Sequence, residues 1–337
     1  MATQLLGRGD VERARRLIES QGLAFEPGFD DLVGAFEGDA LVAVGARQAA
    51  VLKMIAVAPS EQGGPLLGAI VTELAHLAGA AGHEALFVFT RPSSAGSFEA
   101  LGFELLASSG RAALLESGHG LARWLEAHRG PLRAGDHGAV VANCNPFTLG
   151  HRALVEEAAR RVDTLYLLVV REDHSAFPFE ARLRLVREGT ADLANVQVLD
   201  TSRYAVSALT FPAYFLARGD DAAEVQMELD LTLFGRRIAP FFGIRRRFFG
   251  TEPYCATTRR YNEAMARLLP GLGVEPVELQ RRTADGAAIS ASQVRARLRD
   301  GRLDGIEALV PASTAAFLRS GEAAAVRERL RKEEGRH

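Results

Sequence analysis

From residue 139 onward, segments typical of buried strands alternate with segments typical of helices, and this alternation constrains the fold most strongly. We expect strands at residues 139–143, 165–170, 196–199, 247–250 and 274–279, and helices at residues 150–162, 179–189, 258–269 and 290–299. Strands separated by helices form parallel sheets, because each helix carries the chain back to the end of the sheet where the previous strand began. The pattern therefore predicts an α/β domain with a doubly wound parallel sheet, where ligands bind beyond the carboxyl ends of the strands.

The composition excludes several other classes of protein. The 337 residues include 40 Lys and Arg against 42 Asp and Glu, so the net charge is −2 and we expect no nucleic-acid partner. The longest apolar runs, such as residues 165–170, are too short to cross a bilayer, so we expect no membrane partner. Residues 1–10 lack the apolar segment of a signal peptide, and Cys144 and Cys255 cannot form a disulfide framework. We therefore expect a cytoplasmic protein.

Glycine and proline are concentrated between Ser117 and Gly138, which indicates a boundary between domains. We place it near Gly130, giving domains of residues 1–130 and 131–337. The first domain is predicted to be smaller and α+β. Asp10 is expected to cap its first helix, and a long apolar helix is expected at residues 66–80. Strands are expected at residues 32–36, 40–44, 51–57 and 85–90.

The first candidate site is the segment Asn145-Pro146-Phe147-Thr148-Leu149-Gly150-His151, which follows a predicted strand and opens a helix. A helix N-terminus offers unpaired N–H groups and partial positive charge, both suited to a phosphate. Gly150 permits close approach of the backbone, and Thr148 and His151 present polar hydrogens on one edge of the first turn. The alternative is an ordinary loop in which Asn and Thr only cap the helix.

The second candidate site is Ile289-Ser290-Ala291-Ser292-Gln293-Val294-Arg295. Ser290 is a natural N-cap, Ser292 lies in the first turn, and Arg295 follows one turn later. Hydroxyls and a guanidinium at a helix N-terminus suit a polyphosphate. The alternative is a capped surface helix whose arginines are solvated.

Together, T-x-G-H early in a doubly wound domain and I-S-x-S-x-x-R late in it resemble the nucleotidyltransferase superfamily, whose members cleave ATP between the α and β phosphates. Further segments resemble the citrate lyase ligase family, and this resemblance extends over nearly the whole chain; the segments are residues 171–179, 208–215, 250–255 and 261–265. The resemblance implies an acid–thiol ligase that joins acetate to ATP as acetyl-adenylate and releases pyrophosphate. The acetyl group would then pass to the thiol of the CoA-like prosthetic group on the acyl-carrier subunit of citrate lyase, releasing AMP.

The resemblance also implies roles for individual residues. His151, Thr148 and Arg295 are the expected catalytic residues, and Mg²⁺ is expected to shield the phosphates. The expected ATP-binding residues are Asn145, Phe147, Gly150, Ser290, Ser292 and Glu252.

Two of the candidate residues retain alternative roles. Glu252 binds ribose or Mg²⁺, or it stabilises its own loop. Arg171 meets acetate or phosphate, or it is a solvated loop arginine. Cys144 is expected to be a packing residue, and no Cys/His cluster has the spacing of a metal site.

In the first domain, residues 55–66 resemble the strand, glycine loop and helix that bind CoA in GNAT-type acetyltransferases, and residues 98–103 resemble a later segment of that fold. Pro65 stands where a second glycine is usual, and proline has no N–H to give to a phosphate. The domain therefore docks the CoA-like group or serves a structural role.

Two other functions remain open. One is an adenylyltransferase that leaves AMP on a small phosphopantetheine-like substrate. The other is a non-catalytic module that senses nucleotide and CoA. A stable adenylylated product would identify the first, and nucleotide binding without turnover would identify the second.

Overall fold

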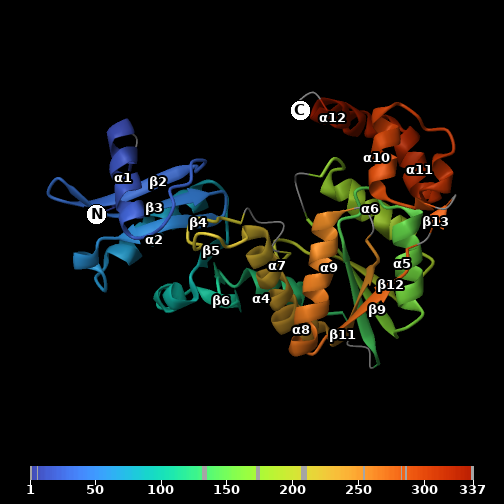
Figure 1. Cartoon of the computed structure of the whole chain (residues 1–337), viewed down its shortest axis with the longest axis horizontal. Helices are drawn as coiled ribbons and strands as arrows, with labels where there is room; N and C mark the ends of the chain where they lie inside the picture. Colours follow the sequence, from blue (N-terminus) through green and yellow to red (C-terminus); the bar gives the residue numbers. More distant parts are fainter. Residues whose placement is uncertain are drawn as a thin grey trace. The chain divides into compact units, whose positions relative to one another are not determined.

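The computed structural model describes residues 2–5, 7–130, 135–171, 175–205, 211–252, 255–281, 283–284 and 287–334 (Figure 1). The chain forms two compact units, Met1–Ala127 with Leu209–Leu233, and His128–Ala208 with Phe234–His337. The sequence predicted a single division near Gly130 and an uninterrupted second domain. The segment Leu209–Leu233 instead belongs to the first unit, although it lies in the middle of the second half of the sequence.

The N-terminal unit is built on a seven-stranded, mostly antiparallel sheet with the order β1-β2-β3-β4-β5-β7-β6. The strands are β1 (Ala2–Gln4), β2 (Asp31–Glu37), β3 (Ala40–Gln48), β4 (Val51–Val57), β5 (Leu86–Thr90), β6 (Glu104–Ser108) and β7 (Ala113–Ser117). Two longer helices pack on β3 and β4, namely α1 (Arg8–Ser20) and α2 (Leu66–Ala80). Three further helices complete the unit: α3 (Ala95–Glu99), α4 (Gly120–Ala127) and α7 (Ala222–Leu233), which packs on β6. This is the predicted α+β arrangement.

β4 and β5 are parallel neighbours that pair only through Val51–Leu52 and Phe87–Val88. The segment that returns from the second half of the sequence lies against β5. The hydroxyl of Tyr214 donates to the Phe89 carbonyl oxygen at 2.9 Å, and Tyr214 and Phe215 are both buried. These contacts join residues 125 positions apart, which explains why local patterns assigned this segment to the wrong unit.

The C-terminal unit contains the predicted parallel sheet, with the order β10-β9-β8-β11-β12. Its strands are β8 (His137–Ala142), β9 (Thr164–Val169), β10 (Val196–Asp200), β11 (Ile244–Gly250) and β12 (Glu275–Leu279). Figure 1 shows the sheet between α9 (Ala256–Leu268) on one side and α5 (Leu149–Ala159) on the other. The strand order reverses between β8 and β11, and this is the point where doubly wound sheets bind ligands.

The C-terminal unit contains further helices and a short two-stranded sheet. They are α6 (Phe179–Gly189), a π-helical turn (Phe234–Ile238), α8 (Ala239–Phe242), the hairpin β13 (Thr283–Ala284) and β14 (Ala287–Ala288), α10 (Ala291–Arg299), α11 (Ala312–Arg319) and α12 (Ala324–Glu334). Val294 and Leu298 of α10 are fully buried in the same core as Leu167 of β9. This packing fixes the position of the α10 N-terminus relative to the sheet.

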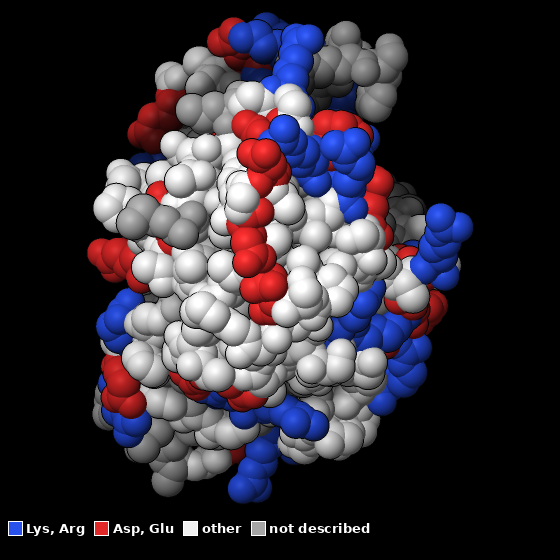
Figure 2. Space-filling view, turned by 90° about the vertical axis from the view of Figure 1, so that its left-hand side faces the viewer, with Lys and Arg blue, Asp and Glu red and all other residues white. Residues whose placement is uncertain are grey.

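Charged side chains do not form one continuous basic area on the face drawn in Figure 2. Asp and Glu side chains form a row across a broad uncharged area, and Lys and Arg lie mainly around it. From Met54 to Thr90, a stretch that includes α2, the sequence has no Lys or Arg. Within the described residues, no helix is both long enough and apolar enough to span a membrane.

Candidate active site

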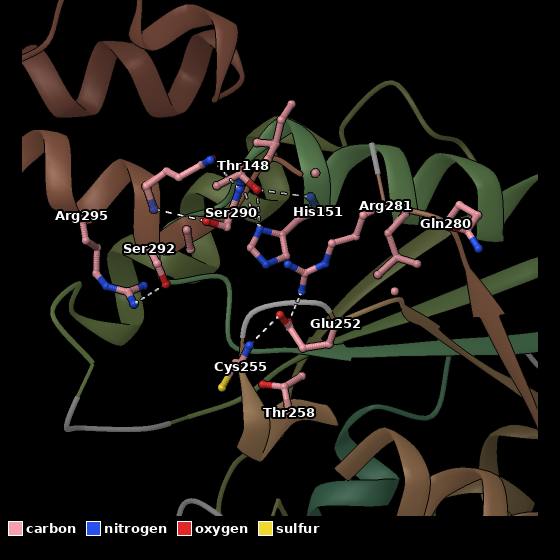
Figure 3. Close-up of a pocket in the computed structure, with 16 residues that line it drawn as sticks. Thr148, His151, Glu252, Cys255, Thr258, Gln280, Arg281, Ser290, Ser292 and Arg295 are labelled. Atoms are coloured by element: carbon pink, nitrogen blue, oxygen red, sulfur yellow. Dashed lines mark hydrogen bonds and ion pairs between the residues drawn. The ribbon is translucent and has the colours of Figure 1, made fainter. Parts of the chain in front are cut away.

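A cavity of about 570 Å³ lies at the carboxyl end of the parallel sheet (Figure 3). Its walls come from the starts of α5, α9 and α10 and from the chain that leaves β11 and β12. The lining residues are Thr148, Gly150, His151, Leu154, Gly250, Glu252, Cys255, Thr258, Gln280, Arg281, Ile289, Ser290, Ala291, Ser292, Gln293 and Arg295. Residues of both candidate motifs, Asn145–His151 and Ile289–Arg295, therefore line one cavity although the motifs are far apart in the sequence.

The start of α5 is held by a reciprocal cap between Thr148 and His151. The Thr148 hydroxyl accepts the His151 backbone N–H at 3.3 Å, and the Thr148 backbone N–H donates to Nδ1 of His151 at 3.1 Å. Because Nδ1 is an acceptor, a neutral ring carries its proton on Nε2. Burial, with the nearby Arg281 and Arg295 charges, lowers the pKa of His151 to about 4. At neutral pH the ring is therefore an uncharged N–H donor.

The start of α10 repeats this arrangement with different residues. The Ser290 hydroxyl accepts the Gln293 backbone N–H at 3.2 Å, and the Ser290 N–H donates to the Gln293 side-chain oxygen at 3.1 Å. Both motifs thus begin helices whose first turns are fixed by a capping box. Arg295 joins the two motifs, since its Nη1 donates to the Asn145 carbonyl oxygen at 2.6 Å and its Nη2 to the Ser292 hydroxyl at 3.2 Å.

Gly150 lets the two motifs approach each other. A Cβ at this position would lie 2.6 Å from the Ile289 carbonyl oxygen, which is closer than Cβ atoms approach other atoms in proteins. The sequence suggested that this glycine makes room for a ligand. The structure shows that it makes room for the backbone of the second motif.

Three predicted residues do not line the cavity. Phe147 is fully buried, and its ring stacks on His151 at a centroid distance of 5.9 Å. Asn145 belongs to the loop between β8 and α5, and its side-chain oxygen accepts the Phe177 N–H at 3.0 Å. Arg171 lies over the Phe179 ring, 4.1 Å from its centroid, with its side chain 44% exposed. Phe147 and Asn145 therefore lie outside the cavity lining, and so does Arg171, which contacts Phe179 and Glu180.

Glu252 lines the cavity, but its two carboxylate oxygens already have partners. One accepts Nη2 of Arg281 at 2.5 Å, and the other accepts the Cys255 N–H at 3.0 Å. Its side chain is only 6% exposed. This geometry fits the predicted alternative in which Glu252 stabilises its own loop.

Sequence reasoning missed Arg281 and Cys255 as cavity residues. Arg281 follows the end of β12, and parallel strands end at one edge of a sheet, so its position carried a usable signal. Cys255 begins α9, and hydrogen bonding from Thr258 lowers the pKa of its thiol. By contrast, Cys144 is 1% exposed, and burial raises the pKa of its thiol to about 12, as expected of a packing residue.

The cavity is rich in cationic groups and donors. Among the lining residues that the structure describes, Glu252 is the one carboxylate, against two arginines, two serine hydroxyls and the N–H of His151. In the part of the chain that the structure describes, no cluster of three or more His, Cys, Asp or Glu residues could hold a metal ion. The arrangement suits an anion that extends from the start of α5 to the start of α10.

A doubly wound sheet with T-x-G-H and I-S-x-S-x-x-R at one cavity defines a nucleotidyltransferase-type domain. Residues 137–318 match the family of citrate lyase ligase C-terminal domains. The chain belongs to the citrate lyase ligase family, and it is an enzyme of the ligase class.

Full-length relatives extend this match to both units. The citrate (pro-3S)-lyase ligase of Klebsiella pneumoniae is 40% identical over 316 residues, which cover 91% of this chain and 92% of the relative. The protein of the same name from Escherichia coli K12 is 35% identical, covering 90% and 89%. A solved ribosomal-protein-S18-alanine N-acetyltransferase from Escherichia coli matches 35% of this chain and 93% of its own, with 18% identity and a TM-score of 0.30. A solved acetyltransferase of the GNAT family from Desulfovibrio desulfuricans matches 35% of this chain, with 21% identity and a TM-score of 0.29.

Proposed function

We propose that the protein activates acetate with ATP and acetylates the prosthetic-group thiol on the acyl-carrier subunit of citrate lyase. In the first step, a carboxylate oxygen of acetate attacks the α-phosphorus, and the bond to pyrophosphate breaks. In the second step, the carrier thiolate attacks the acetyl carbonyl carbon, and AMP leaves with the bonding electron pair. The observation that supports this proposal most directly is the convergence of two capped helix N-termini on one cavity of about 570 Å³.

The chain's own groups act mainly by holding the nucleotide and stabilising charge. His151 donates Nε2–H to a phosphate oxygen, and it does so uncharged. The hydroxyls of Ser290 and Ser292 and the guanidinium of Arg295 take the other end of the triphosphate. The helix caps and the hydrogen bonds of Arg295 fix these side chains before ATP binds. The donors therefore need to move little when negative charge develops on pyrophosphate.

Mg²⁺ belongs to the proposal through the nucleotide. Because Glu252 is engaged by Arg281 and Cys255, we assign no protein ligand to the metal. When bound, Mg²⁺ neutralises charge on the phosphate oxygens.

The decisive experiment measures acetate-dependent exchange of labelled pyrophosphate into ATP. Wild type is expected to exchange label only when acetate is present, and to release AMP steadily only when the carrier thiol is added. His151→Ala is expected to reduce exchange by about 100-fold or more, the usual effect of losing one charge-stabilising donor.

His151→Asn serves as the matched variant for His151→Ala. An asparagine oxygen accepts the Thr148 N–H and so preserves the helix cap, but it cannot place a donor where Nε2 lies. Both variants are expected to lose exchange, and only His151→Ala is expected to lose the cap as well. Exchange in wild type without acetate, or unchanged exchange in both variants, would contradict the proposal. A stable adenylylated product would instead indicate an adenylyltransferase.

A further inference from the structure

Arg281 enters the cavity from the edge of the sheet, and three contacts fix its path. Its backbone N–H donates to the Thr251 hydroxyl at 3.2 Å. Its side-chain stem lies over Gly250, where a Cβ would lie 3.4 Å from Arg281 Cγ. Its Nη2 donates to Glu252 at 2.5 Å. The guanidinium therefore has a defined position beside His151, as Figure 3 shows.

Glu252 is built to hold this guanidinium. It is 6% exposed, and its second oxygen accepts the Cys255 N–H at the start of α9. A carboxylate with both oxygens engaged keeps one orientation, and so does the arginine that it pairs with. This pre-organisation reduces the entropy that Arg281 would otherwise lose on binding a ligand.

Arg281 also retains donors for a ligand. Its side chain is 26% exposed on the cavity wall, and Nε and Nη1 reach no acceptor within the described ranges. Arg295 already donates from Nη1 to the Asn145 carbonyl oxygen and from Nη2 to the Ser292 hydroxyl. Arg281 and Arg295 are both close enough to His151 to lower its pKa, so two guanidinium groups lie near the one Glu252 carboxylate in the described lining.

We propose that Arg281 binds an anionic oxygen pair in this cavity, the carboxylate of the acid or a phosphate of the nucleotide, and that Glu252 is the positioning residue that aims its guanidinium. Nη2 carries a second hydrogen besides the one it gives to Glu252, and this hydrogen with that of Nε or Nη1 forms a fork that matches both anions in geometry. The inference rests on the proposed function for the identity of the two anions, and it adds a binding residue that the T-x-G-H and I-S-x-S-x-x-R motifs do not contain.

The test uses the full-length protein and four variants. Arg281→Lys keeps the charge and removes the fork, Arg281→Ala removes both, and Glu252→Gln keeps the shape of the positioning group and removes its charge. Arg184→Ala is the control, because Arg184 forms an exposed ion pair with Glu322 elsewhere in the same unit. The readouts are the KM for acetate and the KM for ATP in pyrophosphate exchange, with and without added guanidinium ion.

If Arg281 binds acetate, Arg281→Lys raises the KM for acetate by at least tenfold and leaves the KM for ATP within twofold. If it binds phosphate, the two effects are reversed. Glu252→Gln shifts the same constant in the same direction by less, and guanidinium ion restores Arg281→Ala but not Glu252→Gln. Arg184→Ala changes neither constant.

Both KM values within twofold of wild type in Arg281→Lys and Glu252→Gln would overturn the inference, even if Arg281→Ala did not fold. Failure of the proposed function gives a different result, namely no acetate-dependent exchange in wild type. In that event, calorimetric Kd values for ATP and for acetate, compared between wild type and Arg281→Lys, still decide the role of Arg281. Equal Kd values for both anions would then count against it.

Discussion

Each unit has a strand-to-helix turn with glycine close to the start of the helix, in the turn before α2 and in the first turn of α5, yet the two turns differ in what they offer a ligand. The turn between β4 and α2 runs through Gly63 and Gly64 to Pro65, which has no N–H, and no side chain caps the helix. The turn between β8 and α5 ends at Thr148, which is capped reciprocally by His151. The second turn also shares its cavity with the capped start of α10.

We infer from this comparison that an anion site needs more than a helix start with glycine nearby. At α5, the donors are fixed by a cap, a neutral histidine adds an N–H, and a second helix start supplies hydroxyls and a guanidinium. Each contribution is modest alone, and their convergence makes the site specific. The glycine that matters most is therefore the one that lets the two starts approach.

The largest effect is expected from Gly150→Ala. The new Cβ would lie 2.6 Å from the Ile289 carbonyl oxygen, so the starts of α5 and α10 must separate by several tenths of an ångström. Misplacement of binding groups on this scale lowers rates by about 100-fold. We expect that loss in acetate-dependent pyrophosphate exchange, measured together with circular dichroism to confirm folding.

Gly64→Ala is the matched control for Gly150→Ala. Its Cβ would meet the Glu61 carbonyl oxygen at 3.2 Å, a milder contact within the turn before α2. Exchange is expected to stay within twofold of wild type. If both variants lost exchange equally, or if Gly150→Ala kept it, the contrast between the two turns would fail.

The next effect is a dependence of stability on pH that arises at the start of α5. The pKa of His151 is about 4 in the folded protein, against 6.5 for an ordinary histidine. Below pH 6.5 the unfolded chain therefore binds a proton that the folded chain does not, and stability falls as the pH falls from about 6.5 to about 4. The slope is roughly 1.4 kcal/mol per pH unit.

Urea unfolding of wild type and His151→Asn at pH 6.5, 5.5 and 4.5 measures this contribution. The free energy of unfolding of the asparagine variant is expected to fall less on acidification, because this variant has no group to titrate at position 151. The difference between the two proteins is expected to grow by up to roughly 1.4 kcal/mol for each pH unit. Parallel pH profiles for the two proteins would show that His151 is not held neutral in the folded state.

Much of the fold and part of the site follow from local sequence patterns. The order of strands and helices, and the caps at Thr148 and Ser290, depend on residues within one turn of each other. Gly150 is needed because the Ile289 carbonyl oxygen lies against it, and Arg281 is held by Glu252. These partners are far apart in the sequence, so local patterns do not reveal either contact. The placement of Tyr214 in the N-terminal unit depends on Phe89, 125 residues earlier.

The smallest effect on pyrophosphate exchange is expected from Tyr214→Phe. Thr148→Val is the matched variant in the other unit. Each variant removes one hydroxyl and is expected to reduce the free energy of unfolding by about 1 kcal/mol. Tyr214→Phe loses the hydrogen bond to the Phe89 carbonyl oxygen, and Thr148→Val loses the cap of α5. Their effects on pyrophosphate exchange should differ. Tyr214→Phe is expected to leave exchange within twofold of wild type, whereas Thr148→Val is expected to reduce it about tenfold or more, because the hydroxyl also fixes His151 and faces the cavity. An equal loss of exchange in both variants would mean that general stability, and not the geometry at the start of α5, governs the reaction.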